Sequence, residues 1–206
     1  MKRAITIFSQ AGGVGKSTVA LNLKLTLNEA GISPITIVTN EQNHGLDEIL
    51  KNGFLVIPES GNKIPDEVKS LSGVIIFDFA GKTDARIKEA VKMSENILIP
   101  TMGGSSNKIK QFLGTVSDLS DFTDNLTVLV TAYEKTGNKR LIDMAGEVLM
   151  RYPTFMLKKS KSYDSIWDEG RSIRSMWQDG GLNGVNYEKA KEDFNKLIEY
   201  LFSKKA

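Results

Sequence analysis

The feature that most constrains this chain is a glycine-rich segment between an apolar run and a helix-length stretch. The apolar run is Ala4-Ile-Thr-Ile-Phe8, and the glycine-rich segment is Gln10-Ala-Gly-Gly-Val-Gly-Lys-Ser-Thr18. A strand that ends in such a turn and continues into a helix forms a cradle for phosphate. The glycines allow successive backbone N–H groups to point at one oxyanion, and the helix adds the positive end of its dipole. The segment therefore predicts a binding site for a nucleoside triphosphate.

Each residue of this glycine-rich segment, which we call the phosphate loop (residues 10–18), has an expected role. Lys16 is expected to reach the β- and γ-phosphates and to act in catalysis, and the Ser17 hydroxyl is expected to complete a Mg2+ shell. The residues expected to bind the nucleotide are Gly12, Gly13, Val14, Gly15, Lys16, Ser17 and Thr18.

Apolar runs alternate with helix-length segments along the whole chain, which predicts an α/β fold. We expect a mostly parallel sheet of about seven strands with helices on both faces, and one domain over residues 1–206. The expected strands are Ala4–Ser9, Pro34–Val38, Phe54–Ile57, Val74–Phe77, Asn96–Pro100, Leu126–Val130 and Thr154–Leu157. The expected helices are Ser17–Ala30, Pro65–Leu71, Asp84–Ser94, Asn107–Leu119, Asn138–Tyr152, Ser165–Trp177 and Tyr187–Phe202.

Composition limits the classes of function. The chain has no cysteine, which excludes disulfides and cysteine-ligated zinc or iron–sulfur sites. No stretch approaches about 20 apolar residues, and the first residues lead into a strand, so we expect a cytoplasmic protein. The net charge of +2 is too small to indicate a polyanionic partner, so a DNA hypothesis must rest on local clusters of cations.

A second apolar strand, Gly73-Val-Ile-Ile-Phe-Asp78, ends in an acidic residue. In phosphate-loop ATPases an aspartate at this strand end holds the magnesium ion. Asp78 could instead be an ordinary helix cap, but Asp84 is better placed to cap the helix that follows. We therefore expect Asp78 and Ser17 to be the metal-binding residues.

The phosphate loop closely resembles that of the ParA/MinD family of deviant Walker ATPases, where it reads Gln-Lys-Gly-Gly-Val-Gly-Lys-Ser/Thr. The resemblance covers essentially the full length, is strongest over residues 3–31 and 73–105, and is weak around 36–60. Chain length and the C-terminal pattern place it nearest to the short plasmid-partition proteins of the ParA type. The resemblance implies a P-loop NTPase fold, ATP and Mg2+ as cofactors, and a homodimer that forms on ATP binding.

The chain departs from this family at the signature lysine, the residue before the paired glycines that crosses the dimer interface to the partner's nucleotide. Here that position is Ala11, whose methyl group carries no charge. Lys82, Lys108 and Arg86 are candidates for the missing cation. Lys82 comes first among them, because it follows a segment that lies beside the γ-phosphate in the family.

A second departure follows the second strand, where the family has an aspartate that orients the attacking water. This chain has Glu41, which keeps a carboxylate on a longer side chain. Glu41 is therefore the expected catalytic partner of Lys16, and an exposed loop glutamate is the alternative. With both departures, we expect hydrolysis to be slow and stimulated by a partner.

Five cations lie between residues 158 and 174, where short ParA-like proteins have a basic segment that contributes to nonspecific DNA binding. The expected DNA-binding residues are Lys158, Lys159 and Lys161 in a loop, and Arg171 and Arg174 three residues apart on one helical face. Such binding needs neutralisation of phosphates rather than base readout. A solvated charged face is the alternative.

The resemblance implies an ATP-dependent dimer that binds DNA nonspecifically and partitions or positions a plasmid or another cargo. A centromere-binding or cargo adaptor protein would stimulate hydrolysis, and the chain would associate with the nucleoid. One alternative is a MinD-like membrane-associated ATPase, although the acidic residues of the last helix favour docking onto the sheet instead. Two others are a phosphoryl-transfer enzyme similar to dethiobiotin synthetase and an ATP-binding scaffold with little turnover.

Overall fold

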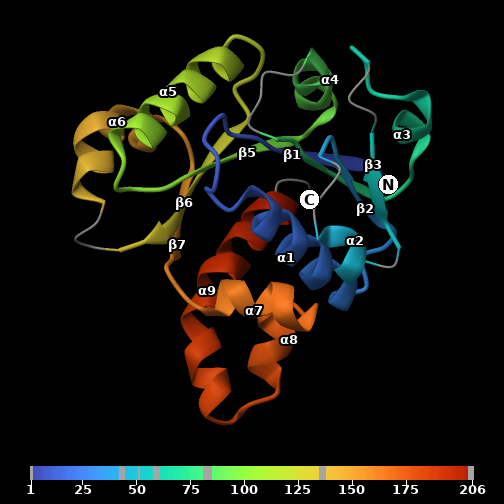
Figure 1. Cartoon of the computed structure of the whole chain (residues 1–206), viewed down its shortest axis with the longest axis vertical. Coiled ribbons are helices and arrows are strands. Elements are labelled where there is room, and N and C mark those ends of the chain that lie inside the picture. The colour runs from blue at the N-terminus through green and yellow to red at the C-terminus, as the bar shows by residue number, and fades with distance from the viewer. Residues whose placement is uncertain are drawn as a thin grey trace.

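Seven parallel strands form one sheet in the order β3-β2-β4-β1-β5-β6-β7 (Figure 1). The structure is a computed structural model that describes residues 2–41, 45–50, 52–57, 61–80, 85–134 and 138–203. The strands are β1 (Arg3–Ile7), β2 (Ile35–Thr39), β3 (Phe54–Val56), β4 (Val74–Asp78), β5 (Asn96–Thr101), β6 (Leu126–Tyr133) and β7 (Thr154–Lys158). The predicted α/β fold and its seven strands are confirmed, with shifts of a few residues at the ends.

Helices cover both faces of the sheet, because its central strands are apolar on both sides. One core packs α4, α5 and α6 against one face, and the other packs α1, α7, α8 and α9 against the opposite face (Figure 1). The helices are α1 (Lys16–Glu29), α2 (Leu46–Ile49), α3 (Asp66–Ser70), α4 (Ala85–Met93), α5 (Ser106–Ser120), α6 (Lys139–Arg151), α7 (Ser162–Glu169), α8 (Ile173–Gln178) and α9 (Gly181–Ser203).

The prediction of one helix over Ser165–Trp177 is wrong. Two helices, α7 and α8, meet at Gly170, which has a φ of 62° in the left-handed region and ends α7. Ser172 then begins α8, since its side-chain oxygen accepts a hydrogen bond from the N–H of Ser175 at 3.0 Å. Arg171 consequently lies between two helices and does not share a helical face with Arg174.

The last helix, α9, packs along the sheet as expected. Its apolar stripe is almost fully buried in the core that contains α1 and one face of the sheet. The buried residues of this stripe are Ala190, Phe194, Leu197 and Leu201. Within the described ranges, no helix is long and apolar enough to cross a membrane.

Strand β1 lies at the point where the chain's connections change direction. It pairs with β4 on one side and β5 on the other, and α1 leaves it on the face opposite to α4. In open parallel sheets, ligands bind beyond the carboxyl ends of the strands at such a point. The phosphate loop follows β1 directly and therefore lies at this edge.

Candidate functional site

The phosphate loop has the backbone of an anion cradle. Gly13 and Gly15 have φ angles of 62° and 83°, and Gly15 immediately precedes the first residue of α1. Gly12 and Gly13 are exposed, while Val14 is buried and anchors the loop in the protein. Left-handed conformations of this kind direct backbone N–H groups into a concave site beside a helix N-terminus.

Lys16 lies at the centre of the charged groups of the site. Its Nζ donates a hydrogen bond to the carbonyl oxygen of Ala11 at 3.2 Å, across the phosphate loop. Burial lowers the pKa of Lys16, and the negative charges of Asp78 and Glu41 oppose this effect. The fold therefore brings together three of the residues that the sequence predicted for catalysis and metal binding.

Asp78 occupies the carboxyl end of β4, where it lies opposite Ile7 of β1 and Thr39 of β2. It is 1% exposed, and Ser17 lies half-buried in the first turn of α1. One carboxylate and one hydroxyl suit Mg2+, which keeps several waters and takes phosphate oxygens as further ligands. Among the described residues, no group of three or more His, Cys, Asp or Glu side chains could hold a metal by itself. The donor set thus fits a magnesium ion that is bound together with a nucleotide.

The segments after β2 and β4 are joined beside this site. The side-chain oxygen of Asn40 accepts a hydrogen bond from the N–H of Ala80 at 2.9 Å, which links the chain beyond Thr39 to the chain beyond Asp78. The N–H of Glu41 donates to Thr39 Oγ1 at 3.2 Å, and the Glu41 side chain is exposed. Asn40 was not predicted, although its place at a strand end beside Glu41 was a usable signal.

A cavity of about 540 Å3 adjoins the phosphate loop and has room for a nucleoside. Its walls include Gly13, Thr18, Thr131 of β6, and residues 159–161, 163 and 164. Thr131 is buried, and its hydroxyl lies within hydrogen-bond distance of the carbonyl oxygens of Val14 (2.8 Å) and Thr101 (3.0 Å). Thr131 thereby connects the phosphate loop to β6. This role depends on the folded contact between β6 and the loop, so the sequence pattern does not reveal it.

Two of the candidates for the missing cation can be placed. Ala11 itself is 0% exposed, so its methyl group points into the protein. Arg86 is 3% exposed within α4, and Lys108 is half-buried in the first turn of α5. Lys82, the preferred candidate, lies outside the described residues.

The predicted DNA-binding cations are dispersed over different surroundings. Lys159 and Lys161 line the cavity beside the phosphate loop, and Lys159 Nζ forms a 2.9 Å ion pair with Glu134. Lys158 and Arg174 are exposed. Lys158 was expected in a loop but is the last residue of β7, and Arg171 and Arg174 do not share the helical face that was expected for them.

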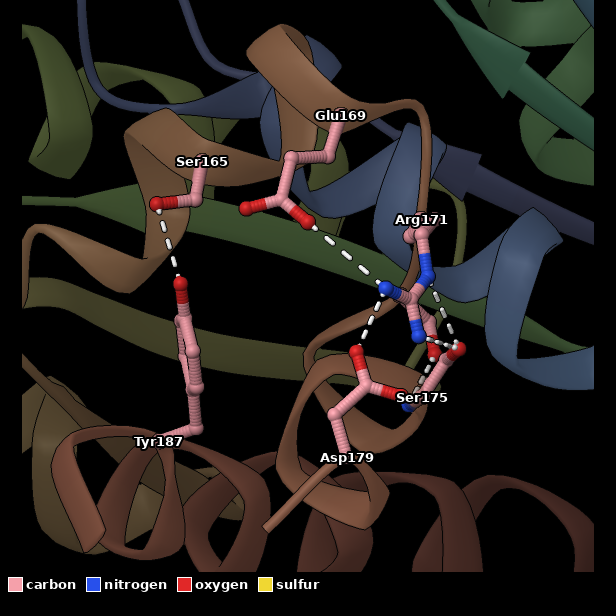
Figure 2. A network of polar contacts seen from close by, with 7 residues as sticks. Ser165, Glu169, Arg171, Ser175, Asp179 and Tyr187 are labelled. Carbon is pink, nitrogen blue, oxygen red and sulfur yellow. Dashed lines mark hydrogen bonds and ion pairs between the residues drawn. The ribbon is translucent and has the colours of Figure 1, made fainter. Parts of the chain in front are cut away.

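Arg171 is engaged by neighbouring side chains (Figure 2). Its guanidinium forms a 2.6 Å ion pair with Asp179, lies 3.8 Å from Glu169, and donates to Ser175 Oγ at 2.9 Å. The hydrogen bond to Asp179 raises the pKa of Arg171 and lowers the pKa of Asp179. A DNA phosphate would have to compete with Asp179 for this guanidinium.

The chain matches neither a protein-family model nor a curated protein sequence. Solved structures match it at low identity. The McdA–ATP complex from Cyanothece has a TM-score of 0.67 and 14% identity, with 100% of this chain and 98% of that chain covered. A plasmid partition protein from Borrelia burgdorferi bound to AMPPNP has a TM-score of 0.62 and 17% identity, with 95% of this chain and 99% of that chain covered. MinD from Pyrococcus horikoshii with Mg-ADP has a TM-score of 0.64 and 17% identity, with 97% of this chain and 98% of that chain covered. The resemblance to ParA/MinD ATPases is thus confirmed at the level of the fold.

Proposed function

We propose that this chain is an ATP-dependent positioning or partition ATPase that uses its nucleotide as a switch. The observation that carries the proposal is the phosphate loop, with Lys16 and Asp78 beside it at the carboxyl edge of the sheet. Proteins of the same fold were solved with ATP, AMPPNP and Mg-ADP, which supports the same class of ligand here. Asp78 and Ser17 would hold the Mg2+, and Lys16 would bind the β- and γ-phosphates.

The switch would act through the two segments that Asn40 joins. A γ-phosphate bound next to Asp78 and Glu41 would affect the positions of both segments, because the hydrogen bond between Asn40 and Ala80 couples them. In many nucleotide switches, the γ-phosphate orders such segments, and its loss releases them. This change creates or removes a binding surface. We propose that this surface is a homodimer interface that forms with ATP and dissolves after hydrolysis.

Hydrolysis itself is proposed to be slow. Ala11 supplies no cation to a partner's nucleotide. The exposed Glu41, two residues beyond β2, has a carboxylate near Lys16 that would orient the attacking water. Release of phosphate from ATP by the wild-type chain and by Lys16→Ala would test this activity. We expect a slow rate that Lys16→Ala abolishes, whereas equal rates for both proteins would show that the loop does not hydrolyse ATP.

We propose that the partner of this switch is DNA, whose phosphates would contact Lys158 and Arg174. Arg171 would also contact a phosphate once its ion pair with Asp179 is broken. The experiment measures binding to an arbitrary duplex with Mg-ATP, Mg-ADP and no nucleotide, at low and moderate salt. We expect binding that requires ATP and weakens with salt. Arg174→Ala should reduce this binding, and Arg151→Ala, an exposed arginine on α6, serves as the control. Absence of binding in every nucleotide state would eliminate DNA as the partner.

A further inference from the structure

Lys108 places an ammonium group against the phosphate loop from a helix other than the one that carries Lys16. A Cβ atom built on Gly13 would lie 3.8 Å from Lys108 Nζ. Gly13 is exposed in the loop, so this Nζ lies close to an exposed part of the loop backbone. Within the described residues, the acceptor found for Lys108 is the thioether of Met102, at 3.3 Å.

The thioether leaves this ammonium available for a stronger ligand. Sulfur in methionine is a weak acceptor, and an ammonium has three N–H donors. A phosphate oxygen would form a charge-assisted hydrogen bond with the same group at a greater gain in free energy. Met102 also lines the cavity beside the loop, so Lys108 Nζ contacts a residue of the cavity wall.

Helix α5 is attached to the phosphate loop by hydrogen bonds, which hold the backbone of Lys108 near the loop. The N–H of Gln10 donates to Thr115 Oγ1 at 3.0 Å, and Gln10 Nε2 donates to Asp118 Oδ2 at 2.8 Å. Gly114 of α5 also lies beside Gln10, because a Cβ atom built there would be in ordinary van der Waals contact with Gln10 Oε1, at 3.4 Å. Lys108 and Thr115 are seven residues apart and therefore lie on the same face of α5.

We propose that Lys108 is a second polyphosphate-binding residue, which contacts the nucleotide of its own chain and supplies there the positive charge that Ala11 cannot. This inference rests on the proposed nucleotide binding. Lys16 and Lys108 would then approach the bound polyphosphate from α1 and α5. The charge would act within one chain and would not depend on dimer formation.

The test measures affinities for Mg-ATP and Mg-ADP by titration calorimetry for the wild type, Lys108→Met, Lys108→Arg and the control Lys110→Met. Lys110 is exposed on the same helix. We expect Lys108→Met to weaken Mg-ATP binding roughly tenfold or more at low salt, with an unchanged melting temperature without nucleotide. Lys108→Arg should retain most of the affinity, and the loss in Lys108→Met should shrink at high salt.

Three results would overturn the assignment of Lys108. They are wild-type affinity in Lys108→Met, an equal loss in Lys108→Arg and Lys108→Met, and a loss that high salt does not change. Lys16→Ala separates this failure from failure of the proposed function. If Lys16→Ala does not bind nucleotide and Lys108→Met binds it with wild-type affinity, the proposed nucleotide binding is supported and the proposed role of Lys108 is rejected. If the wild-type chain binds neither nucleotide, both proposals fail.

Discussion

At the scale of single residues, the glycines of the phosphate loop are not equivalent. Gly15 has a φ of 83°, a conformation that costs a residue with a side chain about 1–2 kcal/mol. A Cβ atom there would also lie 3.8 Å from the Thr131 methyl group. Gly12 has no positive φ, and a Cβ atom there would meet nothing within 4 Å. Gly15 therefore allows the left-handed backbone conformation of the loop, and Gly12 leaves open space for a ligand.

We expect Gly15→Ala to lower the free energy of unfolding by about 1–2 kcal/mol, because of its left-handed backbone. Gly12→Ala is the matched control and should stay within about 0.5 kcal/mol of the wild type. Urea unfolding without nucleotide measures both. Equal effects of the two substitutions would contradict this account of the loop.

A second residue-scale feature is the buried ammonium of Lys24 in α1. The side chain is 4% exposed, and its Nζ donates to the carbonyl oxygen of Ile35 at 2.5 Å. Gly53 makes room for this bond, since a Cβ atom there would lie 2.3 Å from Nζ. Burial lowers the pKa of Lys24 below its ordinary value of 10.5, because the charged form loses hydration.

The pKa of Lys24 leads to a prediction about pH. A lowered folded-state pKa means that the unfolded chain holds more protons between that pKa and 10.5, so stability increases with pH in this window. Lys24→Met removes the titrating group, and we expect wild-type stability to rise relative to this variant as pH approaches 10.5. Denaturant unfolding at several pH values measures the difference. Parallel stability curves would show that the Lys24 amine is not perturbed.

At the scale of elements, α7 is linked to the beginning of α1. The indole N–H of Trp167 donates to Oγ1 of Thr18, the last residue of the phosphate loop, at 3.0 Å. The second tryptophan, Trp177 on α8, instead has Lys191 Nζ 3.2 Å from its ring centroid. One tryptophan therefore contacts the proposed nucleotide site, and the other contacts α9.

This arrangement predicts which tryptophan reports nucleotide binding. Mg-ATP should change the environment of Thr18 and, through the shared hydrogen bond, the emission of Trp167. We expect Trp177→Phe to keep the ATP-dependent change in fluorescence and Trp167→Phe to lose it. The opposite result would place the nucleotide-dependent change at α8 and away from the loop.

The segment between α7 and α9 contains the ion pair of Arg171 with Asp179. In the same region, Tyr187 of α9 donates to Ser165 Oγ of α7 at 3.3 Å (Figure 2). Asp179→Asn would remove the competing carboxylate and release the guanidinium for a DNA phosphate. We expect tighter ATP-dependent DNA binding, with the slope of log K against log salt steeper by about one per chain.

Asp168→Asn is the control for Asp179→Asn, because it removes the same charge at an exposed position of α7. Its salt slope should match that of the wild type. Equal slopes for both variants would mean that Arg171 makes no phosphate contact.

At the scale of the whole molecule, the fold was predictable because apolar strands and helices alternate with clear boundaries. Asp78 is the last residue of its buried strand, so its place beside the phosphate loop was predictable from chain order and parallel pairing. The break at Gly170 was missed because an apolar pattern continues across it, although Gly-Arg-Ser combines a helix end with a helix start.

Contacts between distant segments were not predictable from the sequence. The pairing of Arg171 with Asp179 depends on the path of the chain through α8. The approach of Lys108 to Gly13 depends on the attachment of α5 to Gln10, more than 100 residues earlier in the chain. Neither contact produces a local sequence pattern, so the sequence alone ranked Lys82 before Lys108 as a replacement for the missing lysine.

In the proposed switch, a γ-phosphate bound at this loop changes the oligomeric state of the chain. The most direct test of this switch is the molar mass in solution, measured by sedimentation velocity with Mg-ATP, Mg-ADP and no nucleotide. We expect the wild type to be a dimer only with Mg-ATP, and Lys16→Ala to be a monomer in all three conditions. A wild-type mass that is the same in all three conditions would contradict the proposed switch.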